Sequence, residues 1–294
     1  MIVAMAGFTI SDAISKYVIG PMNVGQLLFV RGCAATLLIG LLTWHKGFFR
    51  NWKQLLHMSV LWRGIGEVGA TMTFMAALSH MPLANVHAIM QALPLAVTMG
   101  AALFLGEMVG WRRWLAIAAG FTGVMIVVRP GMEGFNAYSV LTLISVSFCA
   151  VRDLATSRIP REVPSMLVST LTAAIVTIAG AVIIVPLGGW RPMSGFHFSI
   201  IMSAAVVLLF GYQFLIMSMR EGNVSFVAPF RYTALLWAIA LGFIVFGDIP
   251  DAVTLTGAAI IIASGIYTLY RERKVGKKKM AAQSTGPSMA PDGL

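Results

Sequence analysis

The sequence has 294 residues, of which 58% are hydrophobic and only 11% carry a charge. This composition excludes an ordinary soluble enzyme, a disordered chain and a disulfide-rich secreted domain, and it indicates a membrane protein. Lysine and arginine number 21 against 11 aspartates and glutamates. We attribute this excess to basic residues at the cytoplasmic face of a bilayer, and we expect no nucleic-acid partner.

Ten stretches are apolar enough to cross a bilayer, which requires about 20 residues per helix. They cover residues 2–19, 24–44, 55–78, 83–105, 113–128, 137–156, 164–186, 198–219, 224–246 and 252–270. The first stretch carries Asp12 and Lys16 and lacks a basic start, so we expect a membrane span there and not a cleaved signal peptide. The sequence therefore predicts an all-α integral membrane protein with ten transmembrane helices.

Basic residues gather on one side of the predicted bilayer. With the N-terminus in the cytoplasm, fourteen of them fall in cytoplasmic loops or in the C-terminal tail, whereas the outer loops hold only Arg129 and Arg191. The positive-inside rule therefore predicts that both termini are cytoplasmic. Residues 272–294, which are rich in Lys and then in Ser, Gly and Pro, are expected to form a disordered tail that faces anionic lipids.

Residues 78–130 have a faint copy about 141 residues later in the chain. Gly106-Glu107 matches Gly247-Asp248, and each pair ends one apolar stretch before the next begins. Because each copy belongs to a set of five spans, an odd number, the second set must enter the membrane from the opposite side. We therefore predict a 5+5 inverted repeat, with the first repeat at residues 1–130 and the second at residues 135–271.

Several short motifs resemble those of the drug/metabolite transporter superfamily. In the first three predicted spans these motifs are Ser11-Asp12, Ser15-Lys16-Tyr17, Phe29-Val30-Arg31 and Arg63-Gly64. A second set is similar to the signature of the EamA domain: Met81-Pro82-Leu83-Ala84, Leu93-Pro94-Leu95, Leu105-Gly106-Glu107, Trp111-Arg112-Arg113-Trp114, Gly123-Val124 and Val128-Arg129-Pro130-Gly131. The resemblance extends over nearly the whole chain as two EamA-type halves. The second half departs from it with Gly247-Asp248 in place of Gly-Glu and with no proline to match Pro94.

Within the superfamily, the run from Ala228 to Tyr232 and the Asp12/Lys16 pair look most like the branch of S-adenosylmethionine carriers and bacterial riboflavin uptake proteins. The resemblance implies a multi-pass transporter of the bacterial inner membrane that moves a small polar, ring-containing solute by alternating access, without ATP or a cofactor. Riboflavin is slightly favoured, because Tyr212 and Gln91 offer stacking and hydrogen bonds without charge. The alternative is an exporter of amino acids or other metabolites.

An integral-membrane enzyme and a passive channel are two further alternatives from other classes. The sequence has no His-Glu-x-x-His pair, no aspartate cluster and no Gly-rich phosphate loop. No segment repeats in the manner of a selectivity ring. We therefore expect neither enzymatic activity nor a bound metal.

Charged residues inside the spans need a partner or a wet cavity, because a charge in hydrocarbon costs about 2.5 to 3.5 kcal/mol. Asp12 and Lys16 are one helical turn apart, and Arg31 on the second span lies at nearly the same depth. Asp12 is expected either to form a structural ion pair with Lys16 or Arg31, or to take part in gating or solute contact.

Arg63 and Glu67 form a second pair one turn apart, on the third predicted span. Glu67 is placed near the middle of the bilayer, where desolvation and Arg63 act on its charge in opposite directions. It is predicted to couple transport to protons or to bind solute, and a buried structural pair with Arg63 is the alternative. Arg231 enters the ninth span at the depth of Arg63, where two arginines would favour a carboxylate; the alternative is that Arg231 extends to the headgroups.

His87 and Gln91 lie one turn apart on the fourth span and would line one face of it. The sequence favours a hydrogen-bonded His87 over a proton relay. Tyr212 and Tyr232 either stack on a ring-bearing solute or pack between helices.

Two further groups of residues receive a structural interpretation. Arg152 and Asp153, near the cytoplasmic end of the sixth span, are interpreted as interface charges. Small residues recur at helix-packing spacing in the fifth and tenth spans, where they either hold a half together or form a homodimer.

Overall fold

The computed structural model describes residues 1–47, 55–107, 109–131, 136–160, 162–221 and 228–274. These residues form only helices, turns and loops, and nine of their helical segments are long and apolar enough to cross a membrane. A further helix, α3 (Met58–Leu78), has a comparable length but carries Arg63 and Glu67. The prediction of an all-α membrane protein is confirmed for the described residues, with nine apolar spans and α3 as a less apolar tenth.

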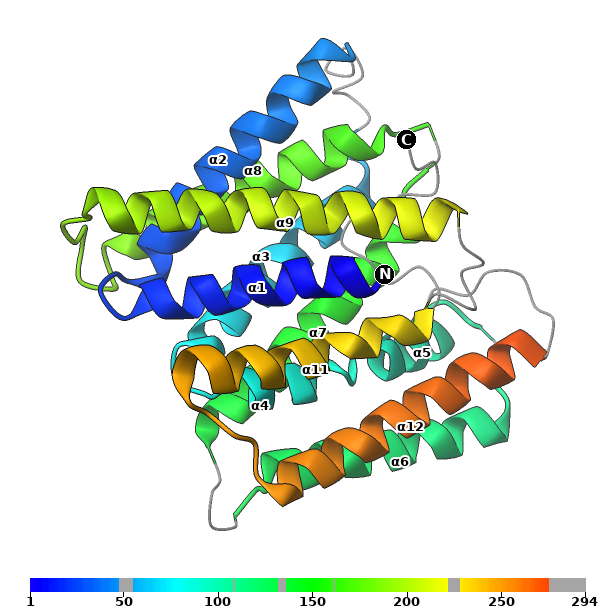
Figure 1. Ribbon diagram of the computed structural model, residues 1–294. Coiled ribbons are helices and arrows are strands. Elements are labelled where there is room, and N and C mark those ends of the chain that lie inside the picture. Colours follow the sequence, from blue (N-terminus) through cyan, green and yellow to red (C-terminus); the bar gives the residue numbers. More distant parts are fainter. Residues whose placement is uncertain (48–54, 108, 132–135, 161, 222–227, 275–294) are drawn as a thin grey trace.

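The helices follow the predicted spans in chain order (Figure 1). Besides α3 they are α1 (Ile2–Ile19), α2 (Val24–His45), α4 (Leu83–Met90), α5 (Leu93–Phe104), α6 (Trp111–Val128), α7 (Ala137–Thr156), α8 (Ser165–Ile184), α9 (Gly195–Glu221), η2 (Ala228–Tyr232), α11 (Thr233–Leu241), η3 (Gly242–Phe246) and α12 (Ala252–Lys274). The last helix ends at Lys274 and not at Tyr270, because Arg, Glu and Lys are good helix formers that extend it beyond its apolar part. The rest of the predicted tail, 275–294, lies outside the described residues.

Two of the predicted spans are interrupted inside the bundle. The fourth divides at Gln91 and Ala92 into α4 and α5, because Pro94 has no N–H to donate to the carbonyl of Met90. In the described residues, the ninth begins as the 3-10 turn η2, which contains Pro229, and ends as the π-helical turn η3. Irregular backbone at membrane depth is tolerated where it is buried in protein or lines a cavity, so these breaks indicate where a site would lie.

The ends of α5 and η3 share one geometry. Gly106 and Gly247 both have a left-handed backbone, with φ of +69° and +72°. In each case the N–H of the next residue, Glu107 or Asp248, bonds to a carbonyl six residues earlier, at 3.2 and 3.0 Å respectively. Both helix ends are therefore closed by the same backbone bond after a left-handed glycine, a residue that adopts positive φ without strain.

The main helix contacts join segments that are far apart in the chain. The helix α1 packs against α9, α2 against α8, α3 against α7 and α6 against α12. Figure 1 shows α1 beside α9 and α6 beside α12. Smaller interfaces join α7 to α4 and α5, and α1 to α11. The two predicted halves are therefore interleaved, and the main hydrophobic core includes residues from both.

Glycines let these helix pairs approach closely. A Cβ at Gly25 would lie 2.9 Å from the carbonyl oxygen of Gly180, and a Cβ at Gly123 would lie 2.8 Å from that of Gly257. A Cβ at Gly66 would lie 2.8 Å from the backbone nitrogen of Arg152. These distances are too short for any larger residue, so the α2–α8, α6–α12 and α3–α7 interfaces depend on glycine. Gly123, one of the small residues of the fifth span, thus packs within the chain.

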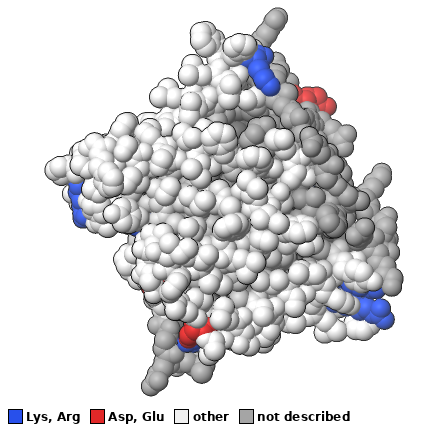
Figure 2. Space-filling model, viewed as in Figure 1, with Lys and Arg blue, Asp and Glu red and all other residues white. Residues whose placement is uncertain are grey.

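The surface has the distribution of charge expected in a bilayer. Figure 2 shows a face that is uncharged over most of its area, with the coloured charged residues at its edges. Large apolar side chains such as Leu37, Ile178 and Phe243 are exposed. An apolar surface of this extent suits contact with lipid.

Candidate solute-binding site

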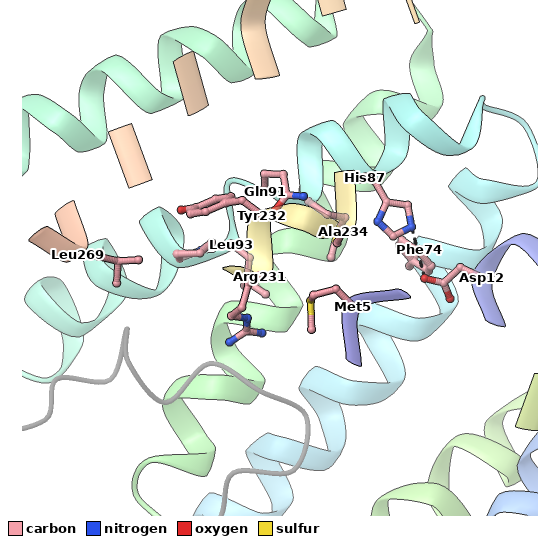
Figure 3. Close-up of a pocket in the computed structure, with 12 residues that line it drawn as sticks. Met5, Asp12, Phe74, His87, Gln91, Leu93, Arg231, Tyr232, Ala234 and Leu269 are labelled. Carbon is pink, nitrogen blue, oxygen red and sulfur yellow. Dashed lines mark ion pairs between the residues drawn. The ribbon is translucent and has the colours of Figure 1, made fainter. Parts of the chain in front are cut away.

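A cavity of about 170 Å³ lies inside the bundle where the two interrupted spans meet α1, α3 and α12. It is lined by Met5, Asp12, Phe74, His87, Met90, Gln91, Leu93, Pro94, Arg231, Tyr232, Ala234 and Leu269. We call this cavity the pocket. Figure 3 shows that its lining side chains come from elements of both predicted halves.

One end of the pocket holds a carboxylate–imidazole pair. Oδ2 of Asp12 on α1 lies 3.4 Å from Nε2 of His87 on α4, and the two side chains are only 16% and 9% exposed. The ring of Phe74 stands edge-on to the imidazole, with centroids 6.1 Å apart. Figure 3 marks the ion pair with a dashed line. A pair this well buried is less screened by water than a surface pair.

Lys16 and Arg31 make contacts that do not involve Asp12. Nζ of Lys16 donates to the carbonyl of Met81, and Arg31 donates to the hydroxyl of Ser15 at 3.0 Å. The expected structural pair between Asp12 and either cation is therefore wrong. The physical reason is tertiary, because the fold brings the imidazole of α4 within reach of the carboxylate while both cations find oxygen acceptors elsewhere.

The other end of the pocket carries Arg231 and Tyr232 from η2, and Gln91 from the end of α4 (Figure 3). Arg231 is half-buried, while Gln91 and Tyr232 are buried. The Tyr232 hydroxyl has no hydrogen-bond partner and occupies the space that a Cβ at Gly265 would need. The pocket thus has a carboxylate at one end, a guanidinium at the other, and mainly apolar walls between them.

A second cluster of charges lies between α3 and α7, away from the pocket lining. Oε1 of Glu67 lies 3.6 Å from the guanidinium of Arg152, which also donates to Asp153 at 2.8 Å. Arg152 and Asp153 are 7% and 3% exposed, so the interpretation of both as interface charges is wrong. Glu67 thus has an ion-pair partner on α7 that the sequence did not suggest, while Arg63, one turn before it on α3, donates to the hydroxyl of Thr156.

Depth along the helices could have identified Arg152 as the partner of Glu67. Arg152 lies about one turn before the C-terminal end of α7, and its side chain is buried within the bundle. Gly66, next to Glu67, lets the backbone of α7 approach. Burial of the pair follows from this close helix contact, which the sequence alone does not specify.

The ten predicted site residues fall into three groups. The pocket brings together Asp12, His87, Gln91, Arg231 and Tyr232; Arg63 and Glu67 lie in the second cluster; Lys16, Arg31 and Tyr212 lie elsewhere. Tyr212 packs edge-on against Phe8 with ring centroids 5.0 Å apart. Met5 and Phe74 were missed, because an apolar residue in an apolar helix carries no signal of a pocket. Among the described residues, no group of three or more His, Cys, Asp or Glu side chains is placed to hold a metal.

Comparisons with known proteins agree with this architecture. Residues 1–129 match the model of the EamA-like transporter family. The chain is 25% identical over 290 residues to the S-adenosylmethionine uptake transporter of Rickettsia felis, covering 96% of this chain and 95% of that protein. It is 27% identical over 206 residues to the riboflavin transporter of Rhizobium johnstonii, covering 70% and 68%. It is 25% identical over 284 residues to the pseudopaline exporter of Pseudomonas aeruginosa, covering 93% and 96%.

The fold likeness extends over nearly the whole chain. A crystal structure that is 18% identical to it has a TM-score of 0.55 and covers 94% of this chain and 99% of its own. The resemblance to the drug/metabolite transporter superfamily is confirmed by the EamA match. Together with the apolar helices, the matches indicate a multi-pass transporter of a small solute in the bacterial inner membrane.

Proposed function

We propose that this chain, whose residues 1–129 are similar to the EamA domain of drug/metabolite transporters, is a secondary active transporter for a small, ring-containing metabolite that carries both charges. S-adenosylmethionine is the solute we expect, moved by alternating access. The observation that carries this proposal is the pocket, with Asp12 at one end and Arg231 at the other. A guanidinium is suited to the carboxylate of such a solute, and a carboxylate attracts its ammonium or sulfonium group.

Riboflavin is the second candidate. Relatives named as riboflavin transporters match 70 to 73% of the chain, whereas those named for S-adenosylmethionine match 94 to 96% of it. The buried Tyr232 hydroxyl without a partner, and Gln91, would suit an uncharged flavin. Tyr212, on which the preference for riboflavin partly depended, packs against Phe8 instead. The two opposite charges in the pocket therefore favour the zwitterion.

An inverted repeat of five plus five spans, residues 1–130 and 135–271, would supply the two halves that alternate. The matching C-caps at Gly106 and Gly247 support it. The helix contacts support it as well. If each span is exchanged with its counterpart five spans later in the chain, the α3–α7 contact becomes the α9–α1 contact. The α2–α8 and α6–α12 contacts stay the same, because each joins a span to its own counterpart. The interrupted fourth and ninth spans are also partners in this exchange. Solute sites in such transporters lie where discontinuous helices of two repeats meet.

Counterflow in proteoliposomes tests the proposed function. Vesicles are loaded with unlabelled S-adenosylmethionine, riboflavin or an aliphatic amino acid, and the labelled form is added outside. Alternating access predicts a transient accumulation of labelled S-adenosylmethionine that needs the same solute inside. Accumulation of the amino acid alone would favour the exporter, and uptake that ignores the internal solute would favour a channel.

The matched control for this assay is the double variant Asp12→Asn with Arg231→Gln. It removes one negative and one positive charge together, so the net charge of the pocket stays the same. We expect it to elute from a sizing column like the wild type and to show no counterflow. Undiminished counterflow by the double variant would contradict the assignment of the pocket.

A further inference from the structure

We propose that Asp12 and His87 form the proton-binding site of the transport cycle, at which the imidazole proton and the positive group of the solute compete for one carboxylate. The inference rests on the proposed function, because it requires a cationic group in the pocket. It deepens that function by naming the coupling ion and the residues that bind it.

The position of His87 is the first observation. It is the one histidine of five that lies inside a span, since His45, His57, His80 and His197 lie at helix ends or in turns. An imidazole is the side chain that most readily changes charge near neutral pH. His87 also lines the pocket beside Asp12, so a bound solute would lie against the pair.

The contacts of the pair are the second observation. His87 is the one ion-pair partner of Asp12 in the described structure, and Nε2 makes no well-directed hydrogen bond. With a cationic solute in the pocket, the positive group of the solute and the imidazolium of His87 would both need the carboxylate of Asp12. When the ammonium or sulfonium of a solute reaches Asp12, the imidazolium becomes a surplus positive charge. Its Nε2–H bond breaks, the electron pair stays on nitrogen, and the proton passes to water on the side to which the pocket is open.

In the described structure, no charged group other than His87 forms an ion pair with Asp12. The charged or titratable groups on the elements around it include Lys16 on α1, Arg31 on α2, Arg63 and Glu67 on α3, Cys149, Arg152 and Asp153 on α7, Tyr212 on α9, and Arg231 and Tyr232 on η2. Lys16 is held by the carbonyl of Met81, and Arg31 by the hydroxyl of Ser15. Neither cation therefore replaces His87 at Asp12 in this conformation.

Glu67 is less suited to the coupling role that its depth predicts. Its carboxylate lies 3.6 Å from Arg152, and a guanidinium does not give up its proton. Protonating Glu67 would leave a buried cation with one partner fewer. Glu67 also lies outside the pocket lining, so a solute there does not meet it directly.

Solute-dependent proton release tests the inference. Purified wild-type protein in a weakly buffered solution with a pH-sensitive dye is expected to release protons when S-adenosylmethionine is added. The release should vanish at a pH at which the imidazole is already neutral. The His87→Gln variant should bind and exchange the solute without releasing protons, and Glu67→Gln, the matched control, should release them like the wild type.

A second variant separates coupling from a structural ion pair. His87→Lys places a permanent cation beside Asp12, so we expect solute affinity to fall at least tenfold relative to His87→Gln. If the pair were only structural, lysine would preserve it and glutamine would break it. His87→Lys would then bind the solute better than His87→Gln and give more folded protein, which is the reverse of the order that we expect.

The outcomes distinguish the inference from the function on which it rests. Counterflow by the wild type without proton release, release that does not depend on pH, or release retained in His87→Gln would overturn the inference and leave the transporter intact. Absence of counterflow for every solute tested would overturn the proposed function, and the inference with it.

Discussion

Arg152 is the cation on which two buried carboxylates depend. It lies 3.6 Å from Glu67 and donates to Asp153 at 2.8 Å. Arg152→Gln removes the guanidinium that contacts both carboxylates, so we expect it to lower the free energy of unfolding by about 3 to 5 kcal/mol. Glu67→Gln should cost less, because Asp153 still balances the guanidinium. The combined variant should recover part of the loss.

Unfolding of the three variants in detergent, followed by circular dichroism, measures this order. The wild type and Tyr212→Phe serve as references, since Tyr212 lies outside the charge cluster. A greater loss in Glu67→Gln than in Arg152→Gln, or no recovery in the combined variant, would contradict the description of Arg152 as the shared partner.

Asp251, just before α12, gives a residue-scale prediction for pH. The hydrogen bond from Arg129, followed by those from Thr254, lowers the pKa of Asp251 well below its ordinary value of 3.8. A group whose folded pKa is lowered stabilises the fold above its ordinary pKa, and this contribution is lost as the pH falls toward the folded value. The side chain is 52% exposed, so the contribution is at most about 1 kcal/mol.

The Asp251→Asn variant should therefore be slightly less stable than the wild type at neutral pH. The difference should shrink as the pH falls below about 4, because the wild-type carboxyl then begins to lose its charge. Melting temperatures of the two proteins at neutral and acidic pH check the sign. A difference that stays constant across the range would contradict it.

At the scale of the element, the sequence predicted the spans well and their interruptions poorly. Hydropathy located the helices because each must bury about 20 apolar residues in hydrocarbon. Pro229 lies at the start of the ninth span, where it removes a backbone N–H and the structure has the turn η2. The break at Gln91 was not predicted, because whether a helix bends or divides at a proline depends on the neighbours that accept the freed backbone groups.

The contact at Gly66 yields an element-scale prediction. A Cβ there would lie 2.8 Å from the backbone nitrogen of Arg152, so Gly66→Ala must push α3 and α7 apart. We expect it to lower both the melting temperature and the amount of folded protein. Gly40→Ala on α2 is the matched control, because its Cβ would lie at an ordinary 3.7 Å from Thr170. Equal stability of the two variants in detergent would contradict the close α3–α7 contact.

At the scale of the whole molecule, depth along each span was predictable but the choice of partners was not. Asp12, His87 and Arg231 lie inside the bundle as their positions in the spans implied. That Asp12 meets His87, and Glu67 meets Arg152, depends on which helices pack together. Helix spacing within one span does not contain this information, because pairings such as α3–α7 join residues far apart in the chain.

The start of α1 and the end of α12 lie at the same end of the bundle (Figure 1). An even number of crossings places both on one side of the membrane, and the basic loops predict that this side is the cytoplasm. A reporter that is active only in the cytoplasm, fused after Tyr270, should therefore give a signal. Activity of a periplasmic reporter at the same site would reverse the proposed orientation.

The central claim is that the two charged ends of the pocket bind the two charged groups of one solute. The most direct measurement is the affinity of wild type and Arg231→Gln for S-adenosylmethionine and for its decarboxylated analogue, which lacks only the carboxylate. A charged hydrogen bond is worth about 1.5 to 3 kcal/mol. We therefore expect Arg231→Gln to weaken binding of S-adenosylmethionine by roughly tenfold to a hundredfold and to leave binding of the analogue nearly unchanged. An equal loss for both compounds, or a loss for neither, would contradict the account.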